Sequence, residues 1–120
     1  MALNLKPLVW HWDTVVKGDT YPAATITESS SDSALERIKI EIKSNGNTTS
    51  SLVLDSDATG ITLNNTDAGA WNFTIDAISA ETTDTLDEQY YAYQLKSYSA
   101  NGVVRTEFVG NWEVTPNIPS

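Results

Sequence analysis

The chain has 120 residues, with 16 acidic and 7 basic side chains and a formal net charge of −9. This length suits one domain with a single hydrophobic core. The negative charge repels phosphate backbones and anionic lipids, so we expect neither nucleic acid nor a membrane surface as a partner. The sequence contains no cysteine, which excludes disulfides, thiolate metal sites and thiol nucleophiles.

The sequence of the first 16 residues is not that of a targeting signal. Its apolar run is interrupted by His11 and Asp13, which makes it too short and too polar for a signal peptide. No stretch of the sequence approaches the ~20 apolar residues of a membrane span. We therefore expect Met1 to be the authentic start of a protein made in the cytoplasm.

Residues 1–16 predict an N-terminal arm or first strand, because Trp and Val favour pleated surfaces and the apolar residues alternate loosely. A turn at Gly18 follows, since glycine takes a positive φ without strain. Residues 20–27 predict a second extended segment, in which Pro22 favours a sheet edge. A polar connection over 28–33 then leads to the next strand.

The clearest strand covers residues 34–44, where isoleucines alternate with charged side chains. Such alternation is typical of a half-buried strand. The three isoleucines that should face the core are Ile38, Ile40 and Ile42. Asn45-Gly46 predicts a tight type I′ hairpin turn after this strand.

Three shorter strands are predicted next, at 51–55, 61–63 and 70–76. In the third of them, apolar side chains alternate with polar ones, and the inward residues should be Trp71, Phe73 and Ile75. The β pattern then breaks at Ser79, whose side chain can cap one helical turn over 79–86.

Residues 89–115 predict a long hairpin with its turn at Asn101-Gly102. Gly110 favours a close backbone approach over a bulge, because the alternation continues past it. Seven to nine short strands with frequent turns indicate an all-β fold, a single antiparallel β-sandwich with one short helical turn. The expected parts are an arm or first strand (1–16), the sandwich (17–115) and a C-terminal tail (116–120).

Three segments, taken in order, carry a resemblance to a known family. They are the KGDTY turn at 17–21, the short strand, turn and alternating strand over 60–75, and the helical turn and hairpin over 79–114. This order resembles small immunoglobulin-like β-sandwich domains of tailed-phage virions, among them the amino-terminal domains of upper baseplate proteins and related tail, neck and head-associated proteins. The resemblance spans residues 8–115. Gln89 departs from it, because that family usually has a glycine there, and residues 10–12 do not map onto it.

The resemblance implies an immunoglobulin-like sandwich that serves as a structural, non-enzymatic part of a virion and assembles symmetrically. It supplies no catalytic or cofactor-binding residues. The partners it implies are other virion proteins and further copies of the chain, and the location it implies is the virion.

Few residues are candidates for chemistry. His11 is the sole histidine, so a metal site or a catalytic base would lack a second such group, and packing or an interface is the expected role. Asp55 and Asp57 have the spacing of a calcium loop but lack a third acidic ligand and a bidentate glutamate. They are a weak metal candidate, and the alternative is a turn stabilised by aspartate side chains.

An acidic run follows the predicted strand at 70–76. Two carboxylates roughly 5–10 Å apart can hydrolyse a glycoside, but acids at a turn or helix start are usually solvated, so an acidic docking patch is the expected role. The run comprises Asp76, Glu81, Asp84, Asp87 and Glu88.

The aromatic residues divide into core and surface candidates. Trp71 and Trp112 are expected in the core from their parity. Trp10 and Trp12 are expected at a subunit interface, because an aromatic arm ahead of a sandwich can pack on a neighbour. The residues expected to be exposed, at an interface or in a sugar-stacking platform, are Tyr90 and Tyr98.

These features support three hypotheses. The first is a virion structural protein that self-assembles or docks onto a larger ring. The second is a carbohydrate-binding module for host glycans, which predicts coplanar exposed aromatics beside Asp, Asn or Gln. The third, an enzyme, lacks any nucleophile, base and orienting group in a recognisable set. No cofactor is expected.

Overall fold

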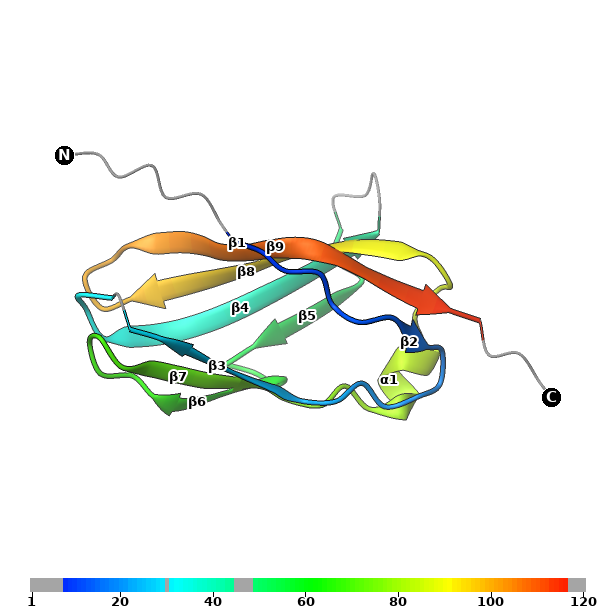
Figure 1. Cartoon of the computed structure of the whole chain (residues 1–120), viewed down its shortest axis with the longest axis horizontal. Coiled ribbons are helices and arrows are strands. Elements are labelled where there is room, and N and C mark those ends of the chain that lie inside the picture. The colour runs from blue at the N-terminus through cyan, green and yellow to red at the C-terminus, as the bar shows by residue number, and fades with distance from the viewer. Residues whose placement is uncertain (1–7, 30, 45–48, 117–120) are drawn as a thin grey trace.

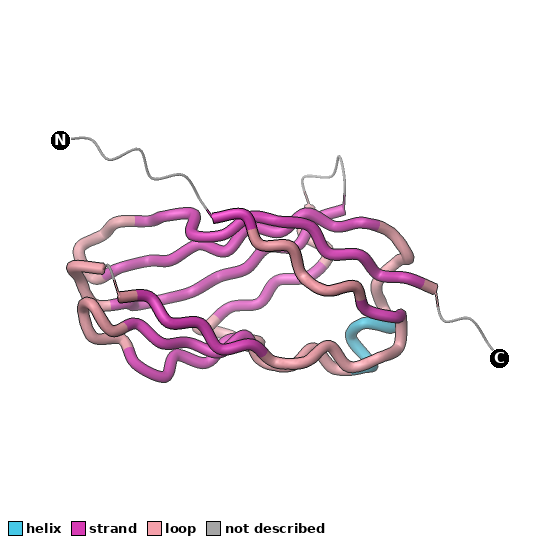
Figure 2. The backbone as a smooth tube through the Cα atoms, in the orientation of Figure 1, coloured by secondary structure: helices cyan, strands magenta, loops and turns pink. Residues whose placement is uncertain are grey.

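Two β-sheets pack face to face in the computed structural model, which describes residues 8–29, 31–44 and 49–116 (Figure 1). The larger sheet has the strand order β1 (Leu8–Val9), β9 (Val104–Thr115), β8 (Tyr90–Ser99), β4 (Leu35–Ser44) and β5 (Leu52–Asp55), and β2 (Val15–Val16) also pairs with β9. The smaller sheet has the order β3 (Ala24–Glu28), β7 (Trp71–Ile75) and β6 (Ile61–Asn65). One helix, α1 (Ala80–Asp84), lies between β7 and β8 in the chain. Figure 2 shows how strands dominate both layers.

The core lies between the sheets and is built from the alternating residues that the sequence predicts. On β4 the three isoleucines have no exposed surface, and on β7 the tryptophan, phenylalanine and isoleucine are all buried. Tyr91, Tyr93 and Leu95 of β8 fill the centre of the larger sheet's inner face. These inward assignments are confirmed, because alternation fixes which residues of a strand share one face.

Residues 8–16 of the N-terminal segment are part of this sandwich. Their backbone runs beside β9 in the parallel direction, with N–H groups of Trp10, Trp12 and Lys17 donating to carbonyls of β9 over 2.9–3.0 Å (Figure 1). Every other strand pairing of the described residues is antiparallel. Residues 8–16 therefore form an edge of the larger sheet and bring Val15 into the core.

Gly110 allows this segment to approach β9. A Cβ atom at this position would lie 2.0 Å from the carbonyl oxygen of Trp10 and 2.8 Å from the ring of Tyr93. No side chain fits at such distances. The expected close backbone approach at this glycine is confirmed.

The strand order identifies an immunoglobulin-like sandwich. The orders β3-β7-β6 and β9-β8-β4-β5 correspond to the two sheets of that fold. In this comparison β5 is the additional strand that variable-type domains have beside their strand C. The hydroxyl of Tyr91, near the start of β8, donates to the backbone carbonyl of Asp87 at 2.8 Å. This is the tyrosine corner typical of the fold.

The turns agree with the sequence where they can be compared. Ser79 caps α1 by accepting from the N–H of Thr82, and Ile78 and Leu86 on either side of the helix are buried. Gly102 has a φ of 83°, which permits the tight turn between β8 and β9. The type I′ turn predicted at Asn45-Gly46 lies outside the described residues.

Candidate functional site

Trp12 lies in the core, so the prediction that it packs on a neighbouring subunit is wrong. Only 6% of its surface is exposed. Its ring stacks on Tyr21 at 5.6 Å and contacts Tyr93 at 4.8 Å and Trp112 at 5.4 Å between centroids. The physical reason is the parallel pairing with β9, which turns this side chain toward the interior. Aromatic contacts of this kind stabilise the cluster beyond simple burial.

Trp10 has the same parity as Trp12 but lies nearer the solvent. It is half-buried and meets Phe108 edge to face, with 5.7 Å between the ring centroids. Its carbonyl oxygen accepts the hydroxyl proton of Tyr93. Burial raises the pKa of Tyr93, so this hydroxyl stays a donor and ties the N-terminal segment to β8. A role for Trp10 at a subunit interface stays a prediction.

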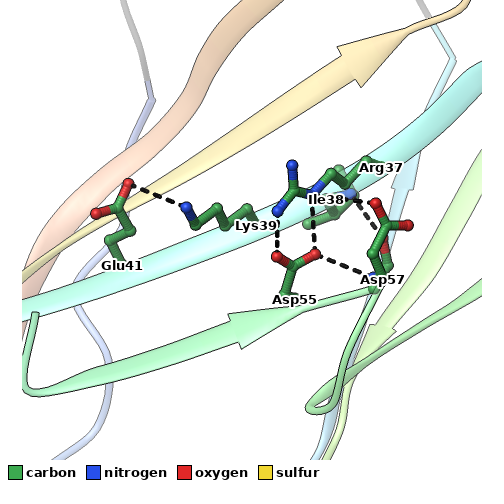
Figure 3. Close-up of polar contacts among 7 residues, drawn as sticks. Arg37, Ile38, Lys39, Glu41, Asp55 and Asp57 are labelled. Atoms are coloured by element: carbon green, nitrogen blue, oxygen red, sulfur yellow. Dashed lines mark hydrogen bonds and ion pairs between the residues drawn. The ribbon is translucent and has the colours of Figure 1, made fainter.

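Arg37 occupies the space between the two carboxylates that were the metal candidates (Figure 3). Its Nε donates to Asp55 Oδ1 at 2.9 Å, its terminal nitrogen pairs with the second oxygen, and Asp57 lies at 3.4 Å. The hydrogen bond from Arg37 holds the pKa of Asp55 below its usual value. Asp55 also accepts the N–H of Asp57 at 3.0 Å, which is the aspartate-stabilised turn of the alternative interpretation. The calcium interpretation is wrong, because these carboxylates are already paired.

Tyr98 and Tyr90 lie on the outer face of β8 in different surroundings. Tyr98 is half-buried, with the Arg37 guanidinium 5.1 Å from its ring centroid. It points outward as predicted but is less open than expected, and its role at an interface stays a prediction. Tyr90 is 64% exposed. The two residues are eight positions apart on one strand, which places them roughly 26 Å from each other. They do not form one sugar-binding platform.

The exposed apolar side chains of the described residues belong to the larger sheet and to the turn between two of its strands. Across the described ranges, every large apolar side chain with substantial exposure lies on a strand of this sheet or on the β8–β9 turn. They are Leu8, Val9, Val53, Tyr90, Val103 and Val104. Because consecutive residues of a strand point to opposite faces, Leu8 and Val9 do not share one face, and the set is spread from one edge of the sheet to the other.

The charges of the larger sheet balance. Its strands hold five basic and five acidic residues, so the other two basic and eleven acidic residues of the chain carry the whole net charge of −9. At the centre of the outer face, Lys39 of β4 lies directly opposite Lys96 of β8. Lys39 pairs with Glu41 at 4.0 Å, whereas Lys96 makes no ion pair within the described part of the chain. Like charges in direct cross-strand register are unfavourable.

The outer face of the smaller sheet is built from short polar side chains that bond to each other. Thr74 of β7 bonds to Thr25 of β3 at 3.0 Å and accepts from Asn64 of β6 at 2.9 Å. Asn64 also donates to Asn72 at 2.8 Å, and Thr62 donates to Asp76 at 3.0 Å. This face has no exposed large apolar residue among the described positions, so its polar groups satisfy one another.

The acidic run does not form a catalytic or metal-binding cluster. Asp76 accepts from Thr62, whereas the carboxylates from α1 to the start of β8 are exposed. Across the described residues, no three His, Cys, Asp or Glu side chains come together as a metal site would require. His11 lies beside β9, where its Nδ1 accepts the N–H of Asn111 at 3.1 Å. No local sequence pattern predicts this contact, because its two partners are 100 residues apart.

No protein-family model and no curated protein matches the chain. Among solved structures, the chain is similar to murine CRIg, with 12% identity and a TM-score of 0.37 over 93% of this chain and 94% of that one. A similarity at this level does not support a fold assignment. The assignment rests on the strand order and the tyrosine corner. In the described residues, no helix has the length and apolar character needed to cross a membrane.

Proposed function

We propose that this protein is a non-enzymatic structural domain that acts by protein–protein assembly, as a component of a tailed-phage virion. The virion role is supported by the sequence resemblance over residues 8–115. The assembly role is supported by the larger sheet, whose strands combine exposed apolar side chains with zero net charge.

The partner that the outer face of the larger sheet fits is a second copy of the chain. Two molecules of net charge −9 repel each other over most of their surfaces. The larger sheet is the region where two copies can meet without that repulsion and bury apolar side chains. A contact between identical faces closes as a symmetric dimer, which a larger symmetric particle can incorporate.

Substitution of one lysine tests this assignment. Lys96→Glu changes the charge of the larger sheet from zero to −2 and removes the like-charge contact with Lys39, so the folded monomer should keep or gain stability. Facing copies then repel, and we expect self-association to weaken about tenfold or more. Light scattering at several protein concentrations measures the association constant, and thermal unfolding checks the fold.

The matched control is Lys17→Glu, which makes the same charge change at a turn outside the sheet strands. It should leave association nearly unchanged. Added salt should strengthen association of the unmodified protein, because it screens the repulsion between the acidic surfaces. A monomeric mass at every concentration and salt level, or equal weakening by both substitutions, would contradict self-association through this face.

Carbohydrate binding is the second candidate function. Of the two tyrosines predicted to be exposed, Tyr90 is open to solvent and adjoins two surface hollows. That single observation favours a glycan site at the end of β8 that contains Tyr90.

A further inference from the structure

Two shallow hollows meet at the side chain of Tyr90, where residues 11–14 run beside residues 111–113 of β9. One has a volume of about 260 Å³ and is lined by His11, Trp12, Thr14, Tyr90, Asn111 and Glu113. The other, of about 340 Å³, is lined by Tyr90, Tyr91, Ala92 and Asn111. Tyr90 and Asn111 therefore belong to both hollows, and the exposed ring of Tyr90 forms a wall shared between them.

The polar groups around Tyr90 have defined donor and acceptor roles. Because His11 Nδ1 accepts the backbone N–H of Asn111, the proton of the neutral imidazole lies on Nε2, which is then a donor. Thr14 donates to one carboxylate oxygen of Glu113 at 3.3 Å, and the other oxygen remains an acceptor. The side-chain amide of Asn111 makes no hydrogen bond to any described residue, so it offers both a donor and an acceptor.

This combination selects a class of ligand. An aromatic face packs against the C–H groups on one side of a pyranose ring, and mixed donors and acceptors match hydroxyl groups, which both donate and accept. The hollows contain a carboxylate and no lysine or arginine, so phosphate and carboxylate ligands are disfavoured. We propose that the two hollows at Tyr90 form a binding site for an uncharged saccharide of one or two rings.

The site rests on the second candidate function and does not depend on self-association. Lys96 is six residues from Tyr90 along β8, roughly 20 Å away. The Lys96→Glu variant therefore leaves both hollows intact while it weakens the proposed dimer. Measuring sugar binding in this variant and in the unmodified protein separates the two proposals.

Saturation-transfer NMR of the full chain tests the site. The probes are glucose, N-acetylglucosamine, cellobiose and N,N′-diacetylchitobiose. We expect transfer to the ring protons of at least one sugar, loss of that transfer to background in Tyr90→Ala, and its retention in Tyr90→Phe, which keeps the ring. Asn111→Ala should reduce the transfer. Gln94→Ala is the control, because Gln94 is exposed on the same strand and lines neither hollow.

The outcomes decide the proposal in either direction. Transfer in the Lys96→Glu variant but not in the unmodified protein supports the site and shows that the dimer covers it. No transfer from any of the four sugars in either protein overturns the proposal. Equal transfer in Tyr90→Ala and in the unmodified protein overturns it as well. A monomeric mass in solution would contradict the proposed dimer but would not change the sugar result.

Discussion

The outer faces of the two sheets differ in the side chains that they expose to solvent. The smaller sheet presents threonine and asparagine side chains that bond to each other across its strands. The larger sheet presents exposed apolar side chains and, at its centre, Lys96, which has no ion pair with any residue that the structure describes. A face whose polar groups are mutually satisfied gains little from a partner, whereas exposed apolar surface gains free energy when it is covered. This comparison is the reason for proposing that the larger sheet, and not the smaller one, meets a partner.

The largest expected effect on stability comes from displacing residues 8–16, which form one edge of the larger sheet. Gly110→Ala places a methyl group 2.0 Å from the carbonyl oxygen of Trp10, so residues 8–16 must shift away from β9. We expect a loss of about 3 kcal/mol in the free energy of unfolding, at the upper end for an overpacked site. Urea unfolding followed by tryptophan fluorescence measures it.

The control for this substitution is Asn111→Ala, because Asn111 is the next residue on β9 and its side chain points to solvent. It should change the free energy of unfolding by less than about 0.5 kcal/mol. A cost for Gly110→Ala as small as that of the control would show that the N-terminal segment is not held against β9.

Acid should weaken the larger sheet through Asp55. The pKa of this carboxyl is lowered in the folded protein by Arg37, so the folded state binds fewer protons than the unfolded state near pH 4. The resulting stability is fully present above the unfolded pKa of about 3.9 and is lost as pH falls through the lower folded value. Thermal unfolding between roughly pH 2 and pH 7 should show this decline.

Asp55→Asn removes the titrating group and leaves Arg37 with Asp57 at 3.4 Å. This variant should be less stable at neutral pH, and its melting temperature should fall less on acidification than that of the unmodified protein. Asp67→Asn is the control, because Asp67 is exposed in the turn before β7. If Asp55→Asn and the unmodified protein lose stability in parallel, Asp55 does not carry the acid sensitivity.

The sequence predicts the fold far better than the surface. Alternation identified Ile38, Ile40 and Ile42 as inward residues because period two is a local property of a strand. The same rule placed Trp10 and Trp12 on one parity but could not show that parallel pairing with β9 would bury Trp12. Non-local pairing of the N-terminal segment with residues about 100 positions away has no local signal in the sequence.

The predictions for individual site residues were right or wrong for reasons that depend on contacts between distant parts of the chain. Asp55 and Asp57 matched a calcium spacing, but their partner Arg37 lies on the preceding strand, and only the β4–β5 register brings it between them. The same arginine covers Tyr98. Tyr90 is exposed as predicted, yet its neighbours His11 and Asn111 come from opposite ends of the chain, so sequence spacing could not assemble the hollow.

The smallest expected effect tests the smaller sheet. Thr74→Val keeps the shape of the side chain but removes its hydrogen bonds to Thr25 and Asn64. Both partners are exposed and can bond to water, so the free energy of unfolding should change by no more than about 0.5 kcal/mol, and the mass in solution should not change. A loss above roughly 2 kcal/mol would mean that the polar lattice holds the sheet together. New self-association would mean that mutual hydrogen bonding, rather than the lack of apolar surface, keeps this face free of partners.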